Sequence, residues 1–256
     1  MKHAETDSLF SEPVHVDPKP GAGIVILCEH ASNRIPEGCD LGLTSEVATS
    51  HAAWDPGALG VAKALAEHLK AALVYGGLSR LLYDCNRPPE APSAMPEKSE
   101  IYEIPGNQGL SAQDRQARVD GIYAPFCAAV AETLAQSDCP VIVTMHSFTP
   151  IYKGAERAVE IGVLHGRDPA LAEAMMERSD MGTPFNVQLN EPYGPQDGVA
   201  HSLDLHGSDN GLRNVMIEIR NDLIRTPEEE RRLAALLAPW ILQAIADLPQ
   251  SRGEGG

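Results

Sequence analysis

One apolar stretch decides the fold of this chain: Asn214-Val215-Met216-Ile217-Glu218-Ile219-Arg220-Asn221-Asp222-Leu223. Short continuous apolar runs of this kind predict a buried strand. Glu218 and Arg220 stand two residues apart within the run and therefore point to the same face of the strand. Ionised groups are rarely buried unless they are paired or bound to a ligand or a metal. The stretch therefore indicates an internal ion pair, a strand end that faces solvent, or a functional site.

The length and composition of the chain indicate one globular domain. Its 256 residues suffice for a single well-buried core, and 43% hydrophobic with 22% charged residues is an ordinary balance for a soluble protein. No apolar run approaches the roughly 20 residues that span a bilayer. The polar, acidic residues 1–7 do not resemble a secretion signal. We therefore expect a cytoplasmic protein with no membrane partner.

Charge and cysteine content exclude two further classes. Lys and Arg number 20 against 36 Asp and Glu, and the resulting net charge of −16 repels nucleic acids and anionic membranes. The cysteines are odd in number and form no C-x-x-C pair, which argues against a disulfide framework or a cysteine zinc site and favours free buried thiols. The five residues are Cys28, Cys39, Cys85, Cys127 and Cys139.

Three more apolar runs predict strands, and each leads directly into polar residues. Polar groups at the carboxyl ends of strands are where open α/β sheets place their chemistry. The runs and the residues that follow them are 24–28 with Glu29 and His30, 80–83 with Asp84, and 141–145 with His146.

Helical patterns alternate with the strands, and this alternation argues a three-layer α/β sandwich around a mostly parallel or mixed central sheet. Residues 21–248 are expected to form its single domain, between a loose arm over 1–20 and a flexible tail over 249–256. Long loops are expected over 88–110 and 190–214. The predicted helices are 44–50, 56–69, 111–136, 169–180 and 226–248, and the remaining strands are 73–75 and 159–164.

The polar strand ends predict one shared site. Carboxyl ends of parallel strands converge on one edge of a sheet, so His30, His146 and Glu218 are expected to share a pocket. Two histidines and a carboxylate are the usual protein ligands of a catalytic zinc, which keeps another position for water. The spacing alone is a weak metal signal because no H-E-x-x-H helix is present. Taken singly, each histidine fits a hydrogen-bonded residue at a strand end equally well.

Arginines at the same strand ends predict an anionic substrate. A guanidinium binds a carboxylate through two parallel hydrogen bonds, which suits Arg80, Arg87 and Arg220. Surface ion pairs are an equal explanation for Arg80 and Arg220. Ser147 lacks the G-x-S-x-G context of a serine nucleophile, and the sequence contains no glycine-rich phosphate-binding motif.

Five motifs resemble the N-formylglutamate amidohydrolase family and occur in its order between residues 23 and 224. They are Cys28-Glu-His-Ala-Ser-Asn33, His51-Ala-Ala-Trp-Asp-Pro-Gly57, Ser79-Arg-Leu-Leu-Tyr-Asp-Cys-Asn-Arg-Pro88, Met145-His-Ser-Phe148 and Ile217-Glu-Ile-Arg-Asn-Asp-Leu223. The resemblance implies a phosphorylase/hydrolase-like α/β fold, related to zinc carboxypeptidases and to aspartoacylase. It also implies hydrolysis of an N-acyl amino acid to a carboxylate and the free amino acid.

The resemblance also implies roles for individual residues. His30 and His146 match the two metal histidines of the wider group, and Glu218 matches its catalytic glutamate. Arg80 falls near the arginine that polarises the scissile carbonyl. The motif Asp84-Cys85-Asn86-Arg87 matches D-x-N-R, in which the asparagine and the arginine hold the substrate carboxylate. Asp84, Asn86 and Arg87 are therefore candidate substrate-binding residues, and Arg220, Ser147 and His206 are further candidates.

The remaining metal ligand departs from the wider group, which has H-x-x-E where this chain has His30-Ala31-Ser32-Asn33. Asp55 is the expected replacement because an aspartate at a helix entrance can turn toward the sheet edge. Glu29 is the alternative, weakened because neighbouring residues on a strand face opposite ways.

Together these observations predict a metal-dependent amidohydrolase that removes the N-formyl, or another N-acyl, group from an acidic amino acid such as N-formylglutamate. Zinc is the expected cofactor, with another divalent metal as the alternative, and the expected partner is this small molecule. Two other functions remain open, namely a non-catalytic anion-binding protein on the same scaffold and the same hydrolysis of a different N-acyl substrate. The sequence does not predict the oligomeric state.

Overall fold

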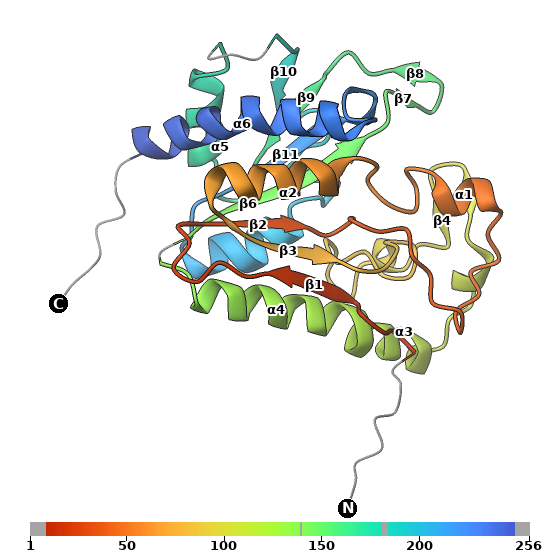
Figure 1. The fold of residues 1–256 in the computed structure, drawn as a ribbon. Helices are drawn as coiled ribbons and strands as arrows, with labels where there is room; N and C mark the ends of the chain where they lie inside the picture. Colours follow the sequence, from red (N-terminus) through yellow and green to blue (C-terminus); the bar gives the residue numbers. More distant parts are fainter. Residues whose placement is uncertain (1–8, 139, 181–183, 249–256) are drawn as a thin grey trace, which may run out of the picture.

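The computed structural model describes residues 9–138, 140–180 and 184–248 (Figure 1). The tail expected over residues 249–256 lies outside the described residues, as do residues 1–8 of the expected arm. The predicted three-layer α/β fold with a mixed central sheet is confirmed.

The central sheet has seven strands in the order β1-β3-β2-β6-β11-β9-β10. Strands β3, β2, β6 and β11 run parallel to one another, whereas β1 is antiparallel to β3 and β9 is antiparallel to β11. Their bounds are β1 Val14–Asp17, β2 Ile24–Cys28, β3 Ala72–Gly76, β6 Val141–Phe148, β9 Ile161–Leu164, β10 Val187–Leu189 and β11 Asn214–Arg220. The parallel arrangement brings the carboxyl ends of β2, β6 and β11 to one edge.

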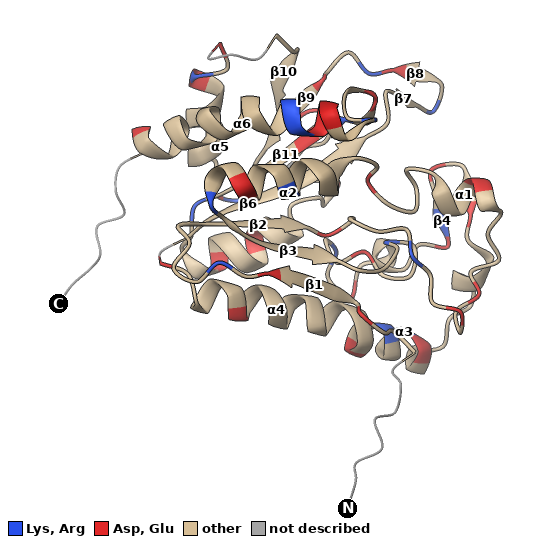
Figure 2. Ribbon diagram, in the orientation of Figure 1, with Lys and Arg blue, Asp and Glu red and all other residues tan. Residues whose placement is uncertain are grey.

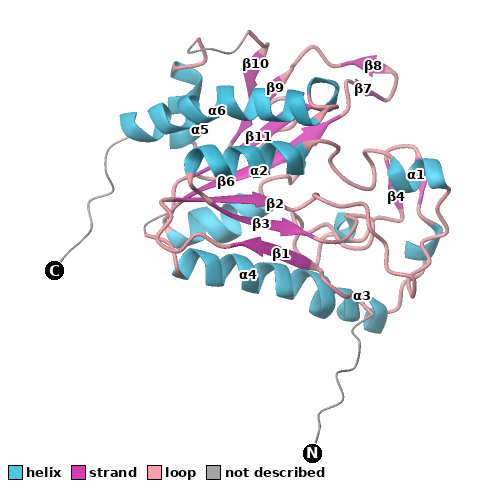
Figure 3. Cartoon of the chain, viewed as in Figure 1, coloured by secondary structure: helices cyan, strands magenta, loops and turns pink. Residues whose placement is uncertain are grey.

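Helices cover both faces of this sheet (Figure 3). One apolar core lies between the sheet and the helices α2 (Ala58–Leu69), α5 (Ala170–Glu177) and α6 (Pro227–Asp247). A second core lies on the other face, under α4 (Ala124–Ala135) and the irregular chain before it. The shorter helices are α1 (Ser45–Thr49) and α3 (Ala112–Arg118), and two small hairpins are formed by β4 (Lys98–Ser99) with β5 (Tyr102–Glu103) and by β7 (Ile151–Tyr152) with β8 (Ala155–Glu156).

Strand β11 forms because alternate side chains along it are buried in the core beneath α2 and α6. Val215, Ile217 and Ile219 are fully buried on the face covered by α2 and α6, and each contributes roughly 1.5–3 kcal/mol by leaving water. Glu218 points to the opposite face. Because β11 pairs with β6 in parallel register, Glu218 lies directly beside His146.

The helix boundaries follow their sequence signals. Thr226 and Glu229 form a capping box at the start of α6, and Ser111 with Asp114 forms one at the start of α3. The helix expected over residues 111–136 is interrupted between α3 and α4 by a wider π turn.

Two expectations about secondary structure were wrong. Within the arm expected over residues 1–20, Val14–Asp17 is instead a strand, β1, which pairs with β3. A four-residue edge strand is only half covered, so it leaves no continuous apolar run in the sequence. Prolines directly before and after β1 are tolerated because it lies at the edge.

The segment 80–83 is a buried turn and not a strand. Its leucines gave it the apolar character of a strand because they are buried in the core, Leu81 at 1% and Leu82 at 0% exposure. Their carbonyl groups accept hydrogen bonds from the side chains of Asn107 and Arg118. These side chains take the place of a neighbouring strand.

Charge is distributed as the composition indicates. Figure 2 shows Asp and Glu spread over helices and loops of both halves of the molecule, in agreement with the net charge of −16. Within the described residues, no helix combines the length and the apolar character needed to cross a membrane.

Candidate active site

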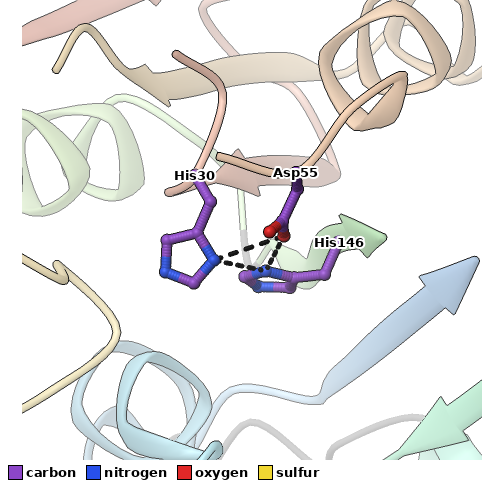
Figure 4. A group of neighbouring side chains, drawn as sticks. All are labelled: His30, Asp55 and His146. Carbon is purple, nitrogen blue, oxygen red and sulfur yellow. Dashed lines mark hydrogen bonds and ion pairs between the residues drawn. The ribbon is translucent and has the colours of Figure 1, made fainter. Parts of the chain in front are cut away.

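His30, Asp55 and His146 meet at the carboxyl edge of the sheet (Figure 4). Oδ2 of Asp55 lies 3.2 Å from Nδ1 of His30 and 3.0 Å from Nδ1 of His146, and the two Nδ1 atoms are 3.3 Å apart. His30 follows β2, His146 is part of β6, and Asp55 precedes α2. All three residues are buried. The structure thus brings together the three residues predicted as metal ligands.

The loop before α2 fixes the position of Asp55. Its backbone N–H donates a 2.9 Å hydrogen bond to the carbonyl oxygen of His30. Gly57 then turns the chain into α2 with a φ of 81°, a left-handed conformation that glycine adopts readily. A Cβ at this position would approach the carbonyl oxygen of Ile224 to 2.3 Å, so only glycine fits. This turn explains why an aspartate outside any strand reaches the histidines.

The spacing of the three ligand atoms fits a tetrahedral metal ion. Zinc binds nitrogen and oxygen ligands at about 2.0–2.1 Å, which places the corners of a regular tetrahedron about 3.3 Å apart. The three observed separations are 3.0, 3.2 and 3.3 Å. His30, Asp55 and His146 therefore fit three corners of a zinc site and leave the fourth corner for another ligand.

A carboxylate lies behind each histidine. Nε2 of His30 is 2.7 Å from Oδ1 of Asp84, and Nε2 of His146 is 3.2 Å from Oε2 of Glu29. Both carboxylates are buried. Metal-binding histidines usually pair their second nitrogen in this way, which fixes the tautomer and orients the ring. Glu29, the alternative metal ligand, thus lies on the far side of His146 from the centre.

The protonation of the two histidines supports a cation at this centre. If each histidine carries its proton on Nε2, the unprotonated Nδ1 atoms of both rings face Oδ2 of Asp55. Three lone pairs then repel one another with no hydrogen between them. Burial alone would lower the pKa of His146, but the Glu29 and Asp55 carboxylates outweigh it and raise this pKa well above its ordinary value. The pKa of His30 is also raised, by Asp84 and Asp55 against burial and Arg80. The centre therefore holds either extra protons or a metal ion.

Arg80 and Ser147 hold the carboxylates of this centre. The Arg80 guanidinium donates to Oδ2 of Asp84 at 2.7 Å and to Oδ1 of Asp55 at 3.3 Å. Burial alone would raise the pKa of both carboxyl groups, but the nearby positive charges outweigh it and keep both pKa values below their ordinary range. The backbone N–H of Ser147 donates to Oδ2 of Asp55, and its hydroxyl donates to the carbonyl oxygen of Pro56.

Glu218 is a buried carboxylate beside the centre. It is 6% exposed, and its Oε2 has no hydrogen-bond partner among the described residues. Burial raises its pKa to about 7, with the positive charge of His146 acting against this rise and the Asp55 carboxylate adding to it. A carboxylate that titrates near neutrality can both accept and return a proton.

A cavity of about 190 Å³ opens onto these residues. It is lined by the three centre residues, Glu218, Arg80, Ser147, Asn86 and Arg87, together with residues from the surrounding loops. Asn86 uses its amide to fasten a loop, because its Nδ2 donates to the carbonyl oxygen of Val199 and its Oδ1 accepts from the N–H of Ser202. Arg87 donates to the neighbouring carbonyl of Asn86 at 2.7 Å. Its side chain is the cavity cation for which the structure gives no carboxylate partner among the described residues.

Three candidate substrate-binding residues lie outside the cavity lining. Asp84 is behind His30, as described above. The guanidinium of Arg220, at the carboxyl end of β11, pairs with Glu160 and Asp222 and does not line the cavity. His206 is buried, and burial lowers its pKa to about 4.

Several residues that line the cavity were not singled out from the sequence as candidates. His51 precedes α2, and Glu100 lies in the turn between β4 and β5. Tyr152 is the last residue of β7, and Tyr193 comes from the loop after β10. The hydroxyl of Tyr193 accepts a 3.0 Å hydrogen bond from Arg157. The loops that carry Glu100 and Tyr193 contain no periodic pattern, so no sequence signal placed them here. His51 belongs to one of the family motifs, which was its only signal.

Comparisons with known proteins address the family and the fold of this chain. The family model for N-formylglutamate amidohydrolase matches residues 22–225. The gene product Atu2144 from Agrobacterium tumefaciens is 48% identical and has a TM-score of 0.89 over 93% of this chain and 98% of that chain. N-formylglutamate amidohydrolase from Ralstonia eutropha JMP134 is 16% identical, with a TM-score of 0.66 over 92% of this chain and 99% of that chain, and supports the shared fold alone. The curated proteins contain no match. The family match spans most of the chain, including every residue of the histidine-aspartate-histidine centre, and the protein therefore belongs to the N-formylglutamate amidohydrolase family of amide-cleaving hydrolases.

Proposed function

We propose that this protein is a zinc-dependent amidohydrolase that removes the formyl, or another small acyl, group from the nitrogen of an acidic amino acid such as N-formylglutamate. The observation that carries the proposal is the centre of His30, Asp55 and His146 with Glu218 in register beside it on the neighbouring strand. The cavity volume of about 190 Å³ lies below the roughly 300–1,000 Å³ of pockets for drug-sized ligands, which favours a smaller substrate. We also propose that the enzyme works in the cytoplasm.

Nδ1 of His30, Oδ2 of Asp55 and Nδ1 of His146 would hold the zinc ion. When bound, zinc supplies Lewis acidity, which polarises a carbonyl group and lowers the pKa of water. Asp84 and Glu29 act as positioning residues: Asp84 accepts a hydrogen bond from Nε2 of His30, and the Glu29 carboxylate forms a 3.2 Å ion pair with Nε2 of His146, so that both Nδ1 atoms stay directed at the centre. Arg80 and Ser147 keep the two aspartates in place.

Glu218 is the proposed general base. Its unpartnered Oε2 can accept a proton from the attacking water, and the same carboxyl group can deliver that proton to the departing amino group. The pKa of about 7 suits both steps, since the group loses and regains its proton with little cost near neutral pH. The backbone pairing of β11 with β6 fixes the distance between Glu218 and His146 of the centre.

Arg87 is the proposed anchor for the substrate. It lines the cavity, and a guanidinium can bind the α-carboxylate through two parallel hydrogen bonds. Asn86 supports this anchor by holding the loop at residues 199–202 against the cavity. Arg80 also faces the cavity, where its charge would stabilise the oxyanion that forms when water attacks the amide.

The direct test is formate release from N-formyl-L-glutamate by the zinc-loaded protein, with chelator-treated protein as the control. We expect turnover only in the loaded sample. Glu218→Gln should lower kcat by at least about a hundredfold, the usual contribution of a general base, and should retain zinc. If zinc-loaded protein releases no acid from a panel of N-formyl and N-acetyl amino acids, the proposed function is wrong.

A further inference from the structure

The turn between β4 and β5 carries Glu100 at a backbone conformation that glutamate rarely adopts. Lys98–Ser99 and Tyr102–Glu103 are joined by a two-residue turn, Glu100 and Ile101, and Glu100 has a φ of 55°. The first position of such a turn favours glycine, asparagine or aspartate when φ is positive. A glutamate held there is uncommon and directs attention to what its side chain contacts.

The Glu100 side chain connects three loops at the cavity. Its Oε2 is 2.7 Å from Nε2 of His51, and its Oε1 accepts a 3.3 Å hydrogen bond from the backbone N–H of Lys153. His51 precedes α2, and Lys153 lies in the turn between β7 and β8. Figure 1 shows both hairpins on the side toward which β2 and β6 point, which is the side of the active site. The Glu100 side chain is 12% exposed.

The two donors that hold Glu100 are of the kind that binds a carboxylate ligand. An imidazole N–H and a backbone N–H converge on one carboxylate, and His51 and Glu100 both line the active-site cavity. The charges of the other cavity cations are already assigned. Arg80 pairs with Asp55 and Asp84, and Arg87 is the proposed anchor for the α-carboxylate.

An acidic substrate has a second carboxylate, and Glu100 occupies the donors that would suit it. We infer that Nε2 of His51 and the backbone N–H of Lys153 form a subsite for the side-chain carboxylate of the substrate. Glu100 fills this subsite in the free protein and is displaced when a dicarboxylic substrate binds. The inference rests on the proposed function, because it assumes that the cavity receives an N-acyl amino acid.

The exchange has two consequences. One carboxylate replaces another on the same donors, so the charge of the subsite is unchanged, and the displaced Glu100 side chain moves toward solvent at the tip of its hairpin. The contact between the hairpins at Glu100 and Lys153 is lost at the same time. A substrate with an uncharged side chain competes poorly for these donors and leaves Glu100 in place.

The test compares two ligands that differ only in this group, N-formyl-L-glutamate and N-formyl-L-glutamine. Their dissociation constants are measured by calorimetry on zinc-loaded protein that carries Glu218→Gln, so that bound ligand is not consumed. Adding Glu100→Gly vacates the subsite and places at the positive φ the residue that tolerates it best. We expect Glu100→Gly to lower the dissociation constant of N-formyl-L-glutamate about tenfold relative to that of N-formyl-L-glutamine. This is the usual scale for a hydrogen bond to a charged group.

His51→Gln should have the opposite effect and remove most of the preference for the acidic ligand. Glu103→Gln, on the same hairpin but paired with Lys98, is the matched control and should leave the preference unchanged. Hydrogen exchange gives a second readout that needs no variant at His51. The backbone amide of Lys153 should be equally protected with either ligand bound, because the acidic ligand takes over the hydrogen bond that Glu100 gives up. The backbone amides of the 98–103 hairpin should exchange faster with the acidic ligand alone, because only that ligand displaces Glu100.

The inference is overturned if Glu100→Gly leaves the ratio of the two dissociation constants within twofold of its parent, or if the acidic ligand leaves the 98–103 hairpin unchanged. It is also overturned if neither ligand binds. Failure of the proposed function has a different signature, since the protein with an intact Glu218 would then cleave neither compound even where both bind.

Discussion

Replacing Glu218 by glutamine should make the metal-free protein more stable above neutral pH. The Glu218 carboxyl group is buried with one oxygen unpartnered among the described residues, and burial raises its pKa from the ordinary 4.5 to about 7. Between these two pH values the unfolded chain has lost the proton and the folded protein still holds it. The stability of the wild-type protein should therefore fall as the pH rises from about 4.5 to about 7, as far as this group is concerned.

The size of the effect follows from the shift in pKa. One pKa unit corresponds to about 1.4 kcal/mol, so the rise from 4.5 to about 7 amounts to at most about 3.5 kcal/mol of lost stability at pH 8. Glutamine has nearly the same shape and cannot ionise. The variant should match the wild type near pH 4.5 and exceed it progressively up to pH 7.

The measurement is urea unfolding of chelator-treated protein at several pH values between 4.5 and 8. Glu177→Gln is the control, since Glu177 is an exposed residue of α5 and its replacement should change stability by less than about 0.5 kcal/mol. If the stability gained by Glu218→Gln does not grow with pH, the burial of an ionisable Glu218 is not what governs its pKa. The argument for a base poised near neutrality then fails as well.

Three further predictions concern the metal centre and the substrate anchor. Glu29→Gln and Asp84→Asn should each weaken zinc binding by about 10–100-fold, measured by competition with a chelator, because each removes the carboxylate that orients one histidine; unchanged affinity would contradict a positioning role. Zinc uptake should release protons and tighten with rising pH through and above pH 6.5, since the pKa values of His30 and His146 are raised in the metal-free protein; calorimetry in buffers of different ionisation enthalpy counts these protons, and a count of zero would refute the prediction. Arg87→Gln should raise KM about 30-fold or more with zinc content unchanged, because a buried carboxylate loses its charged partner; an unchanged KM would place the substrate carboxylate elsewhere.

The sequence predicted those parts of the fold whose pattern reflects burial on both faces. Strands β6 and β11 are continuous apolar runs because they lie at the centre of the sheet, and this also placed His146 and Glu218 at the same edge. The turn at residues 80–83 shows the limit of this reasoning, since burial in an irregular segment produces the same apolar run. Edge strand β1 shows the converse, because a half-covered strand has no such run.

The sequence predicted that the three residues of the centre lie together, but it did not predict most of the contacts around them. Residue type and position at a strand end suffice to predict His30 and His146 as candidate metal ligands. The position of Asp55 at the start of α2 suffices to predict it as the third candidate. The contact of Asp84 with His30 depends on the direction that a side chain takes after a turn, which no local pattern specifies. The contact of Glu100 with His51 joins residues that are 49 positions apart in the sequence. It depends on a hairpin whose two strands have only two residues each, which is too short to leave a pattern in the sequence.

The parallel register of β6 and β11 has a consequence for how this enzyme can change. Side chains alternate between the faces of a strand, so inserting or deleting one residue within β11 before Glu218 would turn its carboxylate into the apolar core beneath α2 and α6. A change in the length of these strands would therefore disrupt the chemical step even if every catalytic side chain were kept. The hairpins and loops that line the cavity are under no such constraint, so new substrate preferences can be engineered by altering loop length while the strands remain as they are.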